Sequence, residues 1–462
     1  MTDSNIDLLK INKIFFCGIG GIGISAAARL LRSQGKNVLG SDAAANEITA
    51  SLEKEGLKIL IPQQTENILP DLDLLVYSVA VPEDNPERMR AKYLKIPEIT
   101  YPQLLGLAMK NKYGIGVSGT DGKTTTTAML AKIMIEGGLD PTVILGSRVD
   151  FLQDNFRLGQ SDYFVFEADE YRRAFDNYFP RLAVLTNIGL DHLDYYKDEA
   201  DYVQAFKDYL NGLPSEGMAI INTDDKKSVE VSEVIRADKM TYAIDGVADL
   251  KVQSIRLCPG SQTFEVIEYG KLATTITLTI PGRYNVYNSL AAIAAARILK
   301  IDWPIIQNAL GEFAGTWRRF ERLGRLEETE VIADYAHTPD AVSKTIVATK
   351  EFYPDKKVLT VFQPHQYART KNLFNDFVRA LTLADQVIVA DVFYVRGREN
   401  PEDFDVSAEK LTKAARKAGA EAIYGGDLAE SERLIRGMAA DFDIILVMGA
   451  GDIYEVAKKL VI

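Results

Sequence analysis

The sequence predicts an α/β fold made of three consecutive α/β domains. Its 462 residues exceed what one ordinary hydrophobic core accommodates. Apolar, strand-like runs alternate with helical segments along the chain, which is typical of mostly parallel, doubly wound sheets. Two glycine-rich loops, GIGGIG from Gly18 and GTDGKT from Gly119, each follow such a run and precede a helix. We expect a Rossmann-like N-terminal domain in residues 1–107, a central P-loop ATPase-type domain with a doubly wound sheet in 108–317, and a Rossmann-like C-terminal domain in 318–462.

Composition excludes several classes of protein. The net charge of -12 and a sequence pI near 5.0 argue against a nucleic-acid partner and against binding to an anionic membrane surface. We find no apolar run of membrane-spanning length and no signal peptide. The two cysteines lie far apart, and Cys17 falls inside an apolar run. We expect a buried, reduced thiol there, as in a cytoplasmic protein.

The N-terminal domain begins with the ingredients of a dinucleotide-type phosphate loop. An apolar strand over 13–18 leads into a GxGxxG arrangement, a helix over 24–34 and a second strand that ends at Asp42. In such a unit the glycines let the backbone approach a pyrophosphate, and the carboxylate binds a ribose. Alternatively, the glycines only permit close helix–strand packing. A further strand over 72–76 precedes a polar loop. The candidate ligand-binding residues are Gly18, Gly20, Gly21, Gly23, Asp42 and Ser78.

The central domain begins with a second phosphate-type loop. A strand that starts at Tyr113 runs into the glycine loop, and a helix-forming segment follows. This geometry turns backbone N–H groups and a helix N-terminus toward phosphates. Lys123 adds a cation and Thr124 a hydroxyl for magnesium, although the loop is shorter than the common GxxxxGK[ST] pattern. The alternative is an ordinary turn and helix start. The candidate nucleotide-binding residues are Gly119, Thr120, Asp121, Gly122, Lys123, Thr124 and Thr125.

Acidic groups and a histidine follow the next predicted strands. Glu167 ends the run 163–166, and His192 lies beyond the run 182–188. Because ligands collect at the carboxyl ends of parallel strands, Lys123, Thr124, Glu167 and His192 form a plausible ATP–magnesium centre. Magnesium prefers oxygen ligands, so His192 suggests a second, less strict metal position. Glu167 could instead cap a helix, and the neighbouring carboxylates Asp169 and Glu170 could replace it.

The remaining chain continues the alternation. We expect a small antiparallel insertion over 250–280, a long helix over 285–299 and a hinge at 317–320, then C-terminal strands over 330–334, 356–362, 386–391 and 443–448. The chain has three histidines, His192, His337 and His365, and each follows a predicted strand. A lone histidine is more often structural, but three such positions together favour function.

Two phosphate-type loops in separate domains imply two phosphorylated ligands. A dehydrogenase needs one dinucleotide fold and has no use for Lys123 and Thr124. A kinase needs an acceptor hydroxyl and a base, which these motifs do not select. A ligase that activates a carboxylate as an acyl phosphate would use both loops, and its third domain would supply an amine pocket. The loops therefore favour a ligase.

The chain resembles the Mur ligases, the family that makes peptidoglycan precursors, over essentially its full length. The motifs that carry the resemblance are GIGGIGIS, VYSVAVPEDNPE, GTDGKTTTTAM, FEADEY, TNIGLDHLDYY, PGRYNVYNSLAA, RRFERLG, DYAHTPDAV, FQPHQYART and MGAGDI. Within the family it is most similar to the members that join L-alanine to UDP-N-acetylmuramate. The resemblance implies an ATP- and Mg²⁺-dependent ligase in the cytoplasm, as a monomer or homodimer, that binds UDP-N-acetylmuramate and a small amino acid and has no nucleic-acid or membrane partner.

The resemblance also implies roles for individual residues. Gly18 to Gly23 would face the diphosphate of the UDP sugar, and the GTDGKT loop would hold the ATP phosphates. One metal would bind Thr124 and Glu167, and His192 would bind a second. Residues for the rest of ATP would be Asn285, Asn288, Arg319 and Asp334, and those near the amine and carboxylate of the amino acid would be His337, His365 and Arg369.

Several positions depart from the family pattern. Asp121 replaces the histidine of GTHGKT, and a negative group beside ATP would need a metal or lysine partner. Lys207 has the spacing of the carbamylated lysine of other Mur ligases or is an ordinary surface lysine. The other departures are Arg172, Tyr284, Thr338 and Gln366. Two further hypotheses are a murein-tripeptide recycling ligase, which usually carries FEPRSN where this chain has FQPHQY, and a catalytically silent nucleotide-binding regulator.

Overall fold

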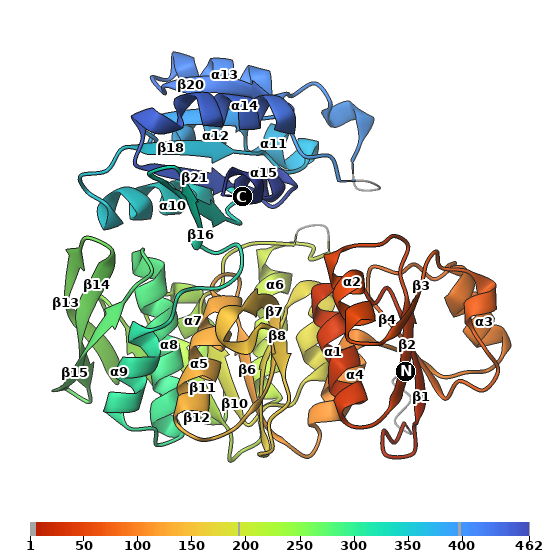
Figure 1. Ribbon diagram of the computed structural model, residues 1–462. Coiled ribbons are helices and arrows are strands. Elements are labelled where there is room, and N and C mark those ends of the chain that lie inside the picture. Colours follow the sequence, from red (N-terminus) through yellow and green to blue (C-terminus); the bar gives the residue numbers. More distant parts are fainter. Residues whose placement is uncertain (1–5, 193–194, 396–398, 462) are drawn as a thin grey trace. The chain divides into compact units, whose positions relative to one another are not determined.

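The computed structural model describes residues 6–192, 195–395 and 399–461, and the strands in these ranges form three sheets (Figure 1). Two compact units emerge from the contacts of the chain. The first comprises Met1–Gln253, Glu265–Thr274 and Tyr287–Leu310, and the second comprises Ser254–Phe264, Thr275–Val286 and Gly311–Ile462. Within the described ranges, no helix has both the length and the apolar character that crossing a membrane requires. The predicted α/β class with three sheets is confirmed.

The N-terminal sheet has the strand order β3-β2-β1-β4-β5, and every pairing in it is parallel. The order reverses between β1 and β4, so the carboxyl end of β1 lies at the switch point where such sheets bind ligands. The strands are β1 Lys13–Cys17, β2 Asn37–Ser41, β3 Lys58–Leu60, β4 Leu74–Tyr77 and β5 Glu98–Thr100. The helices are α1 Ile22–Ser33, α2 Glu47–Lys54, η1 Thr65–Asn67, α3 Pro86–Tyr93 and α4 Tyr101–Met109.

The central sheet has the strand order β15-β14-β13-β12-β11-β10-β6-β9-β7-β8. Strand β6 pairs in parallel with β10 on one side and β9 on the other. The strands are β6 Tyr113–Ser118, β7 Thr142–Val149, β8 Asp154–Arg157, β9 Tyr163–Glu167, β10 Leu182–Leu185, β11 Met218–Asn222, β12 Asp238–Ala243, β13 Leu250–Cys258, β14 Ser261–Glu268 and β15 Lys271–Leu278. The helices are α5 Lys123–Glu136, η2 Asp150–Leu152, η3 Tyr171–Asn177, α6 Glu199–Asn211, α7 Lys226–Ser232, α8 Arg283–Ile298 and α9 Trp303–Gly311.

Two expectations about this sheet are refined. The predicted insertion over 250–280 is present as β13, β14 and β15, but it continues the central sheet because β13 pairs with β12. The predicted run 182–188 is a strand only as far as Leu185, because Thr186 and Asn187 turn to hydrogen-bond the glycine loop after β6.

The C-terminal sheet has the strand order β16-β17-β21-β18-β19-β20, and only β16 is antiparallel to its neighbour. Buried apolar side chains form two clusters in this domain, and helices cover the sheet on both faces. The strands are β16 Glu321–Leu326, β17 Thr329–Asp334, β18 Val358–Phe362, β19 Gln386–Ala390, β20 Ala422–Gly426 and β21 Ile444–Met448. The helices are α10 Pro339–Phe352, α11 Tyr367–Asn372, α12 Phe374–Leu381, η4 Pro401–Asp403, α13 Ala408–Lys417, α14 Leu428–Met438, η5 Ala439–Asp441 and α15 Ile453–Leu460.

The N-terminal and central sheets of the first unit are joined by a buried ion-pair network. Helix α1 packs beside β7 and β8 (Figure 1). From this helix Arg29, whose side chain is 7% exposed, pairs with Glu55 at 2.7 Å and with Asp154 at 2.9 Å. The Asn155 side chain accepts a bond from Arg29 and donates one to the carbonyl of Ile22. The first phosphate-type loop is therefore fixed relative to the central sheet.

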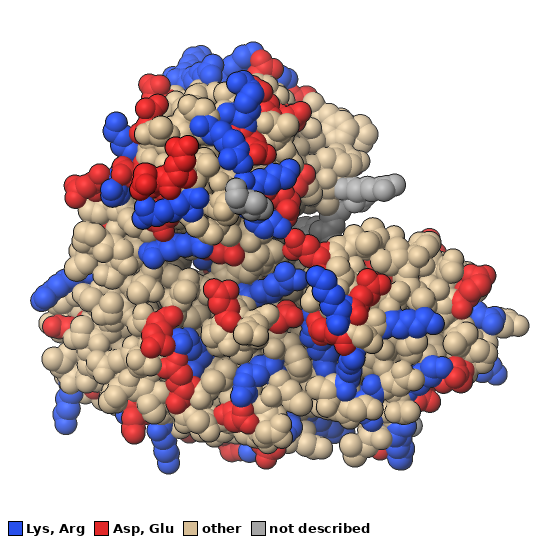
Figure 2. All heavy atoms as spheres, in the orientation of Figure 1, with Lys and Arg blue, Asp and Glu red and all other residues tan. Residues whose placement is uncertain are grey.

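The surface carries charges of both signs. Figure 2 shows Lys and Arg side chains interspersed with Asp and Glu side chains over the face in view. Although the chain carries a net charge of -12, acidic and basic side chains are mixed on that face. Cys17 is buried as predicted, whereas Cys258 is exposed.

Candidate active site

In the glycine loop after β6, two positions require glycine because of their backbone conformation and their close neighbours. Gly119 and Gly122 have φ values of +130° and +82°, in the region that favours glycine. A Cβ atom on Gly122 would lie 2.2 Å from Oδ1 of Asn288, and one on Gly119 would lie 2.1 Å from Oγ1 of Thr186. The loop thus brings Gly122 and Asn288 together. It ends where α5 begins at Lys123, so the helix N-terminus faces the loop.

The segment after β10 holds this loop through backbone contacts. The amide of Thr120 donates to the carbonyl of Asn187 at 3.0 Å, and Thr186 donates to the carbonyl of Asp121 at 2.6 Å. The Asn187 side chain accepts from the Asp121 amide at 3.1 Å and donates to its carbonyl at 3.0 Å. The Asp121 side chain is exposed, and no ion pair to its carboxylate forms among the described residues. The lysine partner considered for Asp121 is therefore absent from the described part of the chain.

Thr124 and Glu167 lie together beside the loop. The Thr124 hydroxyl donates to Oε2 of Glu167 at 2.9 Å, and the Gly146 amide donates to the other carboxylate oxygen. Burial raises the pKa of Glu167, although these hydrogen bonds oppose the shift. A hydroxyl at the start of α5 and a carboxylate at the end of β9 are oxygen ligands of the kind that Mg²⁺ prefers, so these residues fit that ion. Thr125 follows in the first turn of α5 and is half-buried.

Lys123 forms an ion pair with Glu170. Its ammonium group lies 2.8 Å from Oε2 of Glu170 and also donates to the carbonyls of Gly119 and Thr120 at 2.6 and 3.2 Å. Burial lowers the pKa of Lys123, but the nearby carboxylates, Glu170 foremost, outweigh it and hold the pKa above its ordinary value. Lys123 is therefore a cation whose charge is directed along the loop.

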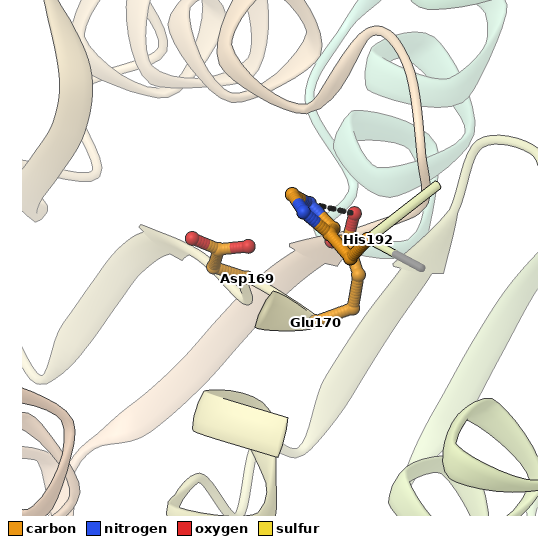
Figure 3. A group of neighbouring side chains, drawn as sticks. All are labelled: Asp169, Glu170 and His192. Carbon is orange, nitrogen blue, oxygen red and sulfur yellow. Dashed lines mark ion pairs between the residues drawn. The ribbon is translucent and has the colours of Figure 1, made fainter. Parts of the chain in front are cut away.

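Asp169, Glu170 and His192 form a cluster whose ligand atoms lie within 4.8 Å of one another (Figure 3). His192 Nε2 is 3.7 Å from Oε1 of Glu170, and the figure shows the imidazole leaning toward that carboxylate. The structure thus places His192 with Asp169 and Glu170, while Glu167 pairs with Thr124. Glu170 is 1% exposed and lies between Lys123 and His192. The sequence suggests Glu170 only as a replacement for Glu167, but in the structure it contacts both Lys123 and His192.

The phosphate-type loop of the N-terminal domain is held by Asp42. The Asp42 carboxylate accepts from the Gly20 amide at 2.8 Å, and a Cβ on Gly20 would lie 2.8 Å from it. Gly18, with φ +80°, packs against Ser78, whose amide donates to the Cys17 carbonyl. The loop, Asp42 and Ser78 are therefore assembled at the carboxyl ends of β1, β2 and β4. The remaining glycines, Gly21 and Gly23, cap and begin α1, and Gly23 packs against Tyr101.

Two of the departures from the family pattern occupy defined positions in the first unit. Arg172, with φ +51°, donates to the carbonyl of Val79 at 3.2 Å, beside Ser78. Lys207 pairs with Glu230 at 2.7 Å. A carbamate on Lys207 would place two negative groups together, so the structure favours an unmodified lysine.

In the second unit, Asp334 is buried at the end of β17. Its carboxylate accepts from the amides of Phe320 and Ala336, both at 2.8 Å. Burial raises its pKa, and Arg319 acts in the opposite direction. The guanidinium of Arg319 lies 4.8 Å from the centre of the Tyr335 ring. Arg319, from the predicted hinge, and Asp334, at the end of the next strand, thus belong to one cluster.

His337, His365 and Arg369 form a second cluster in this unit. The two imidazole rings are 5.9 Å apart, and Arg369 Nη1 lies 3.2 Å from Nδ1 of His365. Nδ1 of His337 is 2.9 Å from the Tyr335 carbonyl. Burial, with help from the neighbouring cations, lowers the pKa of His337 to about 4. A neutral imidazole is able to interact with an amine, and the neighbouring guanidinium with a carboxylate.

The structure adds to the candidate site two residues that were not predicted from the sequence, Tyr202 and Arg318. Tyr202 on α6 is fully buried and hydrogen-bonds both Glu170 and Thr120. Arg318 donates to the carbonyls of Gly449 and Gly451, which ties the MGAGDI motif to the segment before β16. The RRFERLG motif could have indicated Arg318, whereas nothing in the local sequence around Tyr202 shows its two partners.

Among the residues that were predicted, Asn285 lies at the start of α8, where its side-chain amide donates to the Pro281 carbonyl at 2.7 Å.

These features define a three-sheet α/β protein with a short nucleotide-type loop, a carboxylate–hydroxyl pair beside it and a second phosphate-type loop. Comparison with known families agrees with this class. The chain matches the family models "Mur ligase family, catalytic domain" over residues 13–113, "Mur ligase middle domain" over 117–296 and "Mur ligase, glutamate ligase domain" over 318–451. The chain belongs to the Mur ligase family.

Individual relatives cover nearly the whole chain. It is 38% identical to a UDP-N-acetylmuramate–L-alanine ligase of Caldanaerobacter subterraneus over 98% of each chain. The crystal structure of the UDP-N-acetylmuramate-alanine ligase from Thermotoga maritima has a TM-score of 0.84 at 31% identity, over 97% of this chain and 98% of that one. A murein peptide ligase from Psychrobacter arcticus has a TM-score of 0.70 at 25% identity, over 97% and 98%.

Proposed function

We propose that this chain is an ATP-dependent ligase that joins L-alanine to the lactyl carboxylate of UDP-N-acetylmuramate in peptidoglycan precursor synthesis. The observation that carries the proposal is the pairing of Thr124 with Glu167 beside the Lys123 ammonium, in a chain 38% identical over 98% of its length to an L-alanine ligase. We assign residues 1–107 to the UDP sugar, 108–317 to ATP and 318–462 to the amino acid. We place the enzyme in the cytoplasm, as a monomer or homodimer.

The binding residues divide by ligand. In the N-terminal domain, the Gly18 to Gly23 loop, whose Gly20 amide donates to Asp42, would face the diphosphate of the UDP sugar, and Ser78 lies beside the loop. ATP would be held by the loop from Gly119 to Thr125, with Asn285, Asn288, Arg319 and Asp334. Thr124 and Glu167 would hold Mg²⁺, and His192 would hold a second ion beside Asp169 and Glu170. When bound, the magnesium ions would neutralise charge on the phosphates.

The reaction has two steps, transfer of a phosphoryl group and attack by the amine. An oxygen of the lactyl carboxylate forms a bond to the γ-phosphorus of ATP as the bond to the β–γ bridging oxygen breaks, which gives an acyl phosphate and ADP. The amino nitrogen then bonds to the acyl carbon, and phosphate leaves with its oxygen. Lys123, held as a cation by its carboxylate neighbours, stabilises the phosphoryl oxygens in both steps.

The amino acid would bind at the His337, His365 and Arg369 cluster. The guanidinium of Arg369 suits the α-carboxylate of the amino acid. A neutral His337 is able to accept the proton that the amine loses when it attacks. This assignment gives His337 a catalytic role and makes His365, which bonds Arg369, a binding residue.

A panel of substrates tests the function. The enzyme is given ATP, Mg²⁺ and UDP-N-acetylmuramate with L-alanine, glycine or L-serine, and separately with a murein tripeptide in place of the amino acid. Phosphate release and product mass are measured, with Lys123→Ala as the control. We expect UDP-N-acetylmuramoyl-L-alanine and no product from the variant. A product only with the tripeptide would instead support a recycling ligase, which the similarity to a murein peptide ligase makes the second candidate. Nucleotide binding without any product would indicate a silent regulator.

A further inference from the structure

Glu170 stands at the centre of a buried network, and the roles above give its carboxylate no part beyond its place beside the second ion. The carboxylate is 1% exposed and receives the Lys123 ammonium on both oxygens, at 2.8 and 3.1 Å. Its Oε1 also accepts from the Tyr202 hydroxyl at 3.2 Å and lies 3.7 Å from Nε2 of His192. A buried carboxylate needs such partners, because burying a charge without them is costly.

The three N–H groups of Lys123 are matched by three acceptors. These are the carbonyls of Gly119 and Thr120 and the carboxylate of Glu170. An ammonium group has three donors. The cation therefore folds back over its own loop, and a phosphate that binds there must compete with one of these acceptors. Glu170 is the acceptor with a full negative charge, so it sets the direction of the ammonium.

Tyr202 links this carboxylate to the other end of the loop. Its hydroxyl is 2.9 Å from Oγ1 of Thr120, which in turn lies 2.7 Å from the carbonyl of Gly189. The Tyr202 hydroxyl has one proton, so it donates either to Glu170 or to Thr120. When Lys123 moves toward a phosphate, Glu170 loses that donor but keeps the Tyr202 hydroxyl as a donor to Oε1. The carboxylate of Glu170 therefore retains a hydrogen-bond partner in both positions of Lys123.

We propose that Glu170 is a positioning residue that holds and aims the Lys123 ammonium, and that Tyr202 couples Glu170 to Thr120 so that both ends of the nucleotide loop are held together. The proposal rests on the proposed function, because it assumes that the loop binds a nucleotide. Glu170 therefore affects the reaction by positioning Lys123, and Tyr202 affects it by positioning Glu170.

Two near-isosteric variants test the proposal. Glu170→Gln keeps the shape and an acceptor oxygen but removes the charge, and Tyr202→Phe removes only the hydroxyl. We expect Glu170→Gln to lower kcat ~10-fold or more while the Kd of Mg-ADP stays within ~2-fold or decreases, since one negative charge near the phosphates is gone. We expect Tyr202→Phe to lower kcat ~3-fold to 10-fold, about the effect of one lost hydrogen bond. A purely structural role would instead raise Kd and lower Tm.

A matched control and a double variant separate the alternatives. Tyr196→Phe removes a hydroxyl that donates to the backbone carbonyl of Glu170 and not to its carboxylate, so we expect kcat and Kd within ~2-fold of wild type. In a Lys123→Ala background, which forms no product, Glu170→Gln should change the Kd of Mg-ADP by less than ~2-fold, because its partner is already gone.

Each contrary outcome has a distinct meaning. An undiminished kcat in Glu170→Gln, or a change of more than ~2-fold in the Kd of Mg-ADP when Glu170→Gln is added to Lys123→Ala, would overturn the inference. So would a rise in the Mg²⁺ concentration needed for half-maximal rate without any loss at saturating Mg²⁺, because it would assign the carboxylate to a metal. If wild type fails to bind Mg-ADP, the proposed function itself fails.

Discussion

The hydroxyl of Thr124 donates a 2.9 Å hydrogen bond to the carboxylate of Glu167, across 43 residues of sequence. Thr124 lies in the first turn of α5 and Glu167 ends β9, and β9 is the direct neighbour of β6 in the sheet. The parallel pairing of β6 and β9 therefore sets the distance between these two oxygen groups. The position of a magnesium ion would follow from sheet register rather than from a flexible loop.

Removing the Thr124 hydroxyl tests this pair. Thr124→Val keeps the side-chain shape but removes one oxygen ligand, so we expect kcat to fall about 10²-fold, with a higher Mg²⁺ requirement, as is usual when a charge-stabilising contact is lost. Steady-state rates over a Mg²⁺ titration measure both effects. Thr124→Ser is the matched control, and it should retain activity within ~5-fold. Equal activity of the valine and serine variants would show that the hydroxyl does not bind the metal.

The departure at Asp121 should have little effect on activity. Its side chain is exposed, and its backbone, not its carboxylate, bonds Asn187. We therefore expect Asp121→Ala to keep kcat and the KM for ATP within ~3-fold of wild type. Asn187→Ala removes two hydrogen bonds to the loop, and we expect it to raise the KM for ATP ~10-fold. The reverse order of effects in ATP-saturation curves would give the Asp121 carboxylate a direct role.

The Arg29 ion pairs should stabilise the first unit. Arg29→Ala leaves the Asp154 carboxylate without its 2.9 Å partner at a half-buried position. We expect the free energy of unfolding to fall by about 2–3 kcal/mol, which is somewhat less than for a fully buried pair because Asp154 retains some contact with water. Urea unfolding followed by circular dichroism measures the change. Arg32→Ala, an exposed position on the same helix, should change stability by less than ~0.5 kcal/mol, and similar losses in both variants would refute a specific role for the network.

His337 should remain neutral well below neutral pH. Burial lowers its pKa from an ordinary value of 6.5 to about 4. The folded state then binds this proton more weakly than the unfolded chain, so the contribution of His337 to stability is present above pH 6.5 and is lost as the pH falls toward 4. NMR titration of labelled histidines, with His337→Gln for assignment, measures the midpoint. A midpoint above 6 would remove the basis for a neutral imidazole in the amino-acid site.

Sequence patterns predicted the parts of this protein that local rules determine. The glycine loops at Gly18 and Gly119 could be found because a strand, a loop and a helix follow one another within a short segment. Most strands were also predicted, since buried parallel strands are continuous apolar runs. Strands β3, β5, β7, β8, β12, β16 and β20 fall outside the predicted runs. Five of them lie at the edge of a sheet, where fewer side chains are buried, whereas β7 and β12 lie inside the central sheet.

Partners set by tertiary contact were beyond the reach of sequence patterns. Glu170 and Asp169 both follow β9, and the sequence alone does not show that Glu170 turns inward to Lys123. Tyr202 lies on a helix 32 residues from Glu170, and no spacing rule connects them. The pairing of Arg29 with Asp154 depends in the same way on the packing of α1 against β8. These relations follow from how the elements pack.

The acyl-phosphate route through this site is tested most directly by oxygen transfer. UDP-N-acetylmuramate labelled with ¹⁸O in its lactyl carboxylate is incubated with the enzyme, ATP, Mg²⁺ and L-alanine, and the released phosphate is analysed by mass spectrometry. Because the carboxylate oxygen attacks phosphorus and then leaves with it, we predict one ¹⁸O atom in each phosphate and none when Lys123 is replaced by alanine. Product formation with unlabelled phosphate, or no product from the wild-type enzyme, would contradict the account.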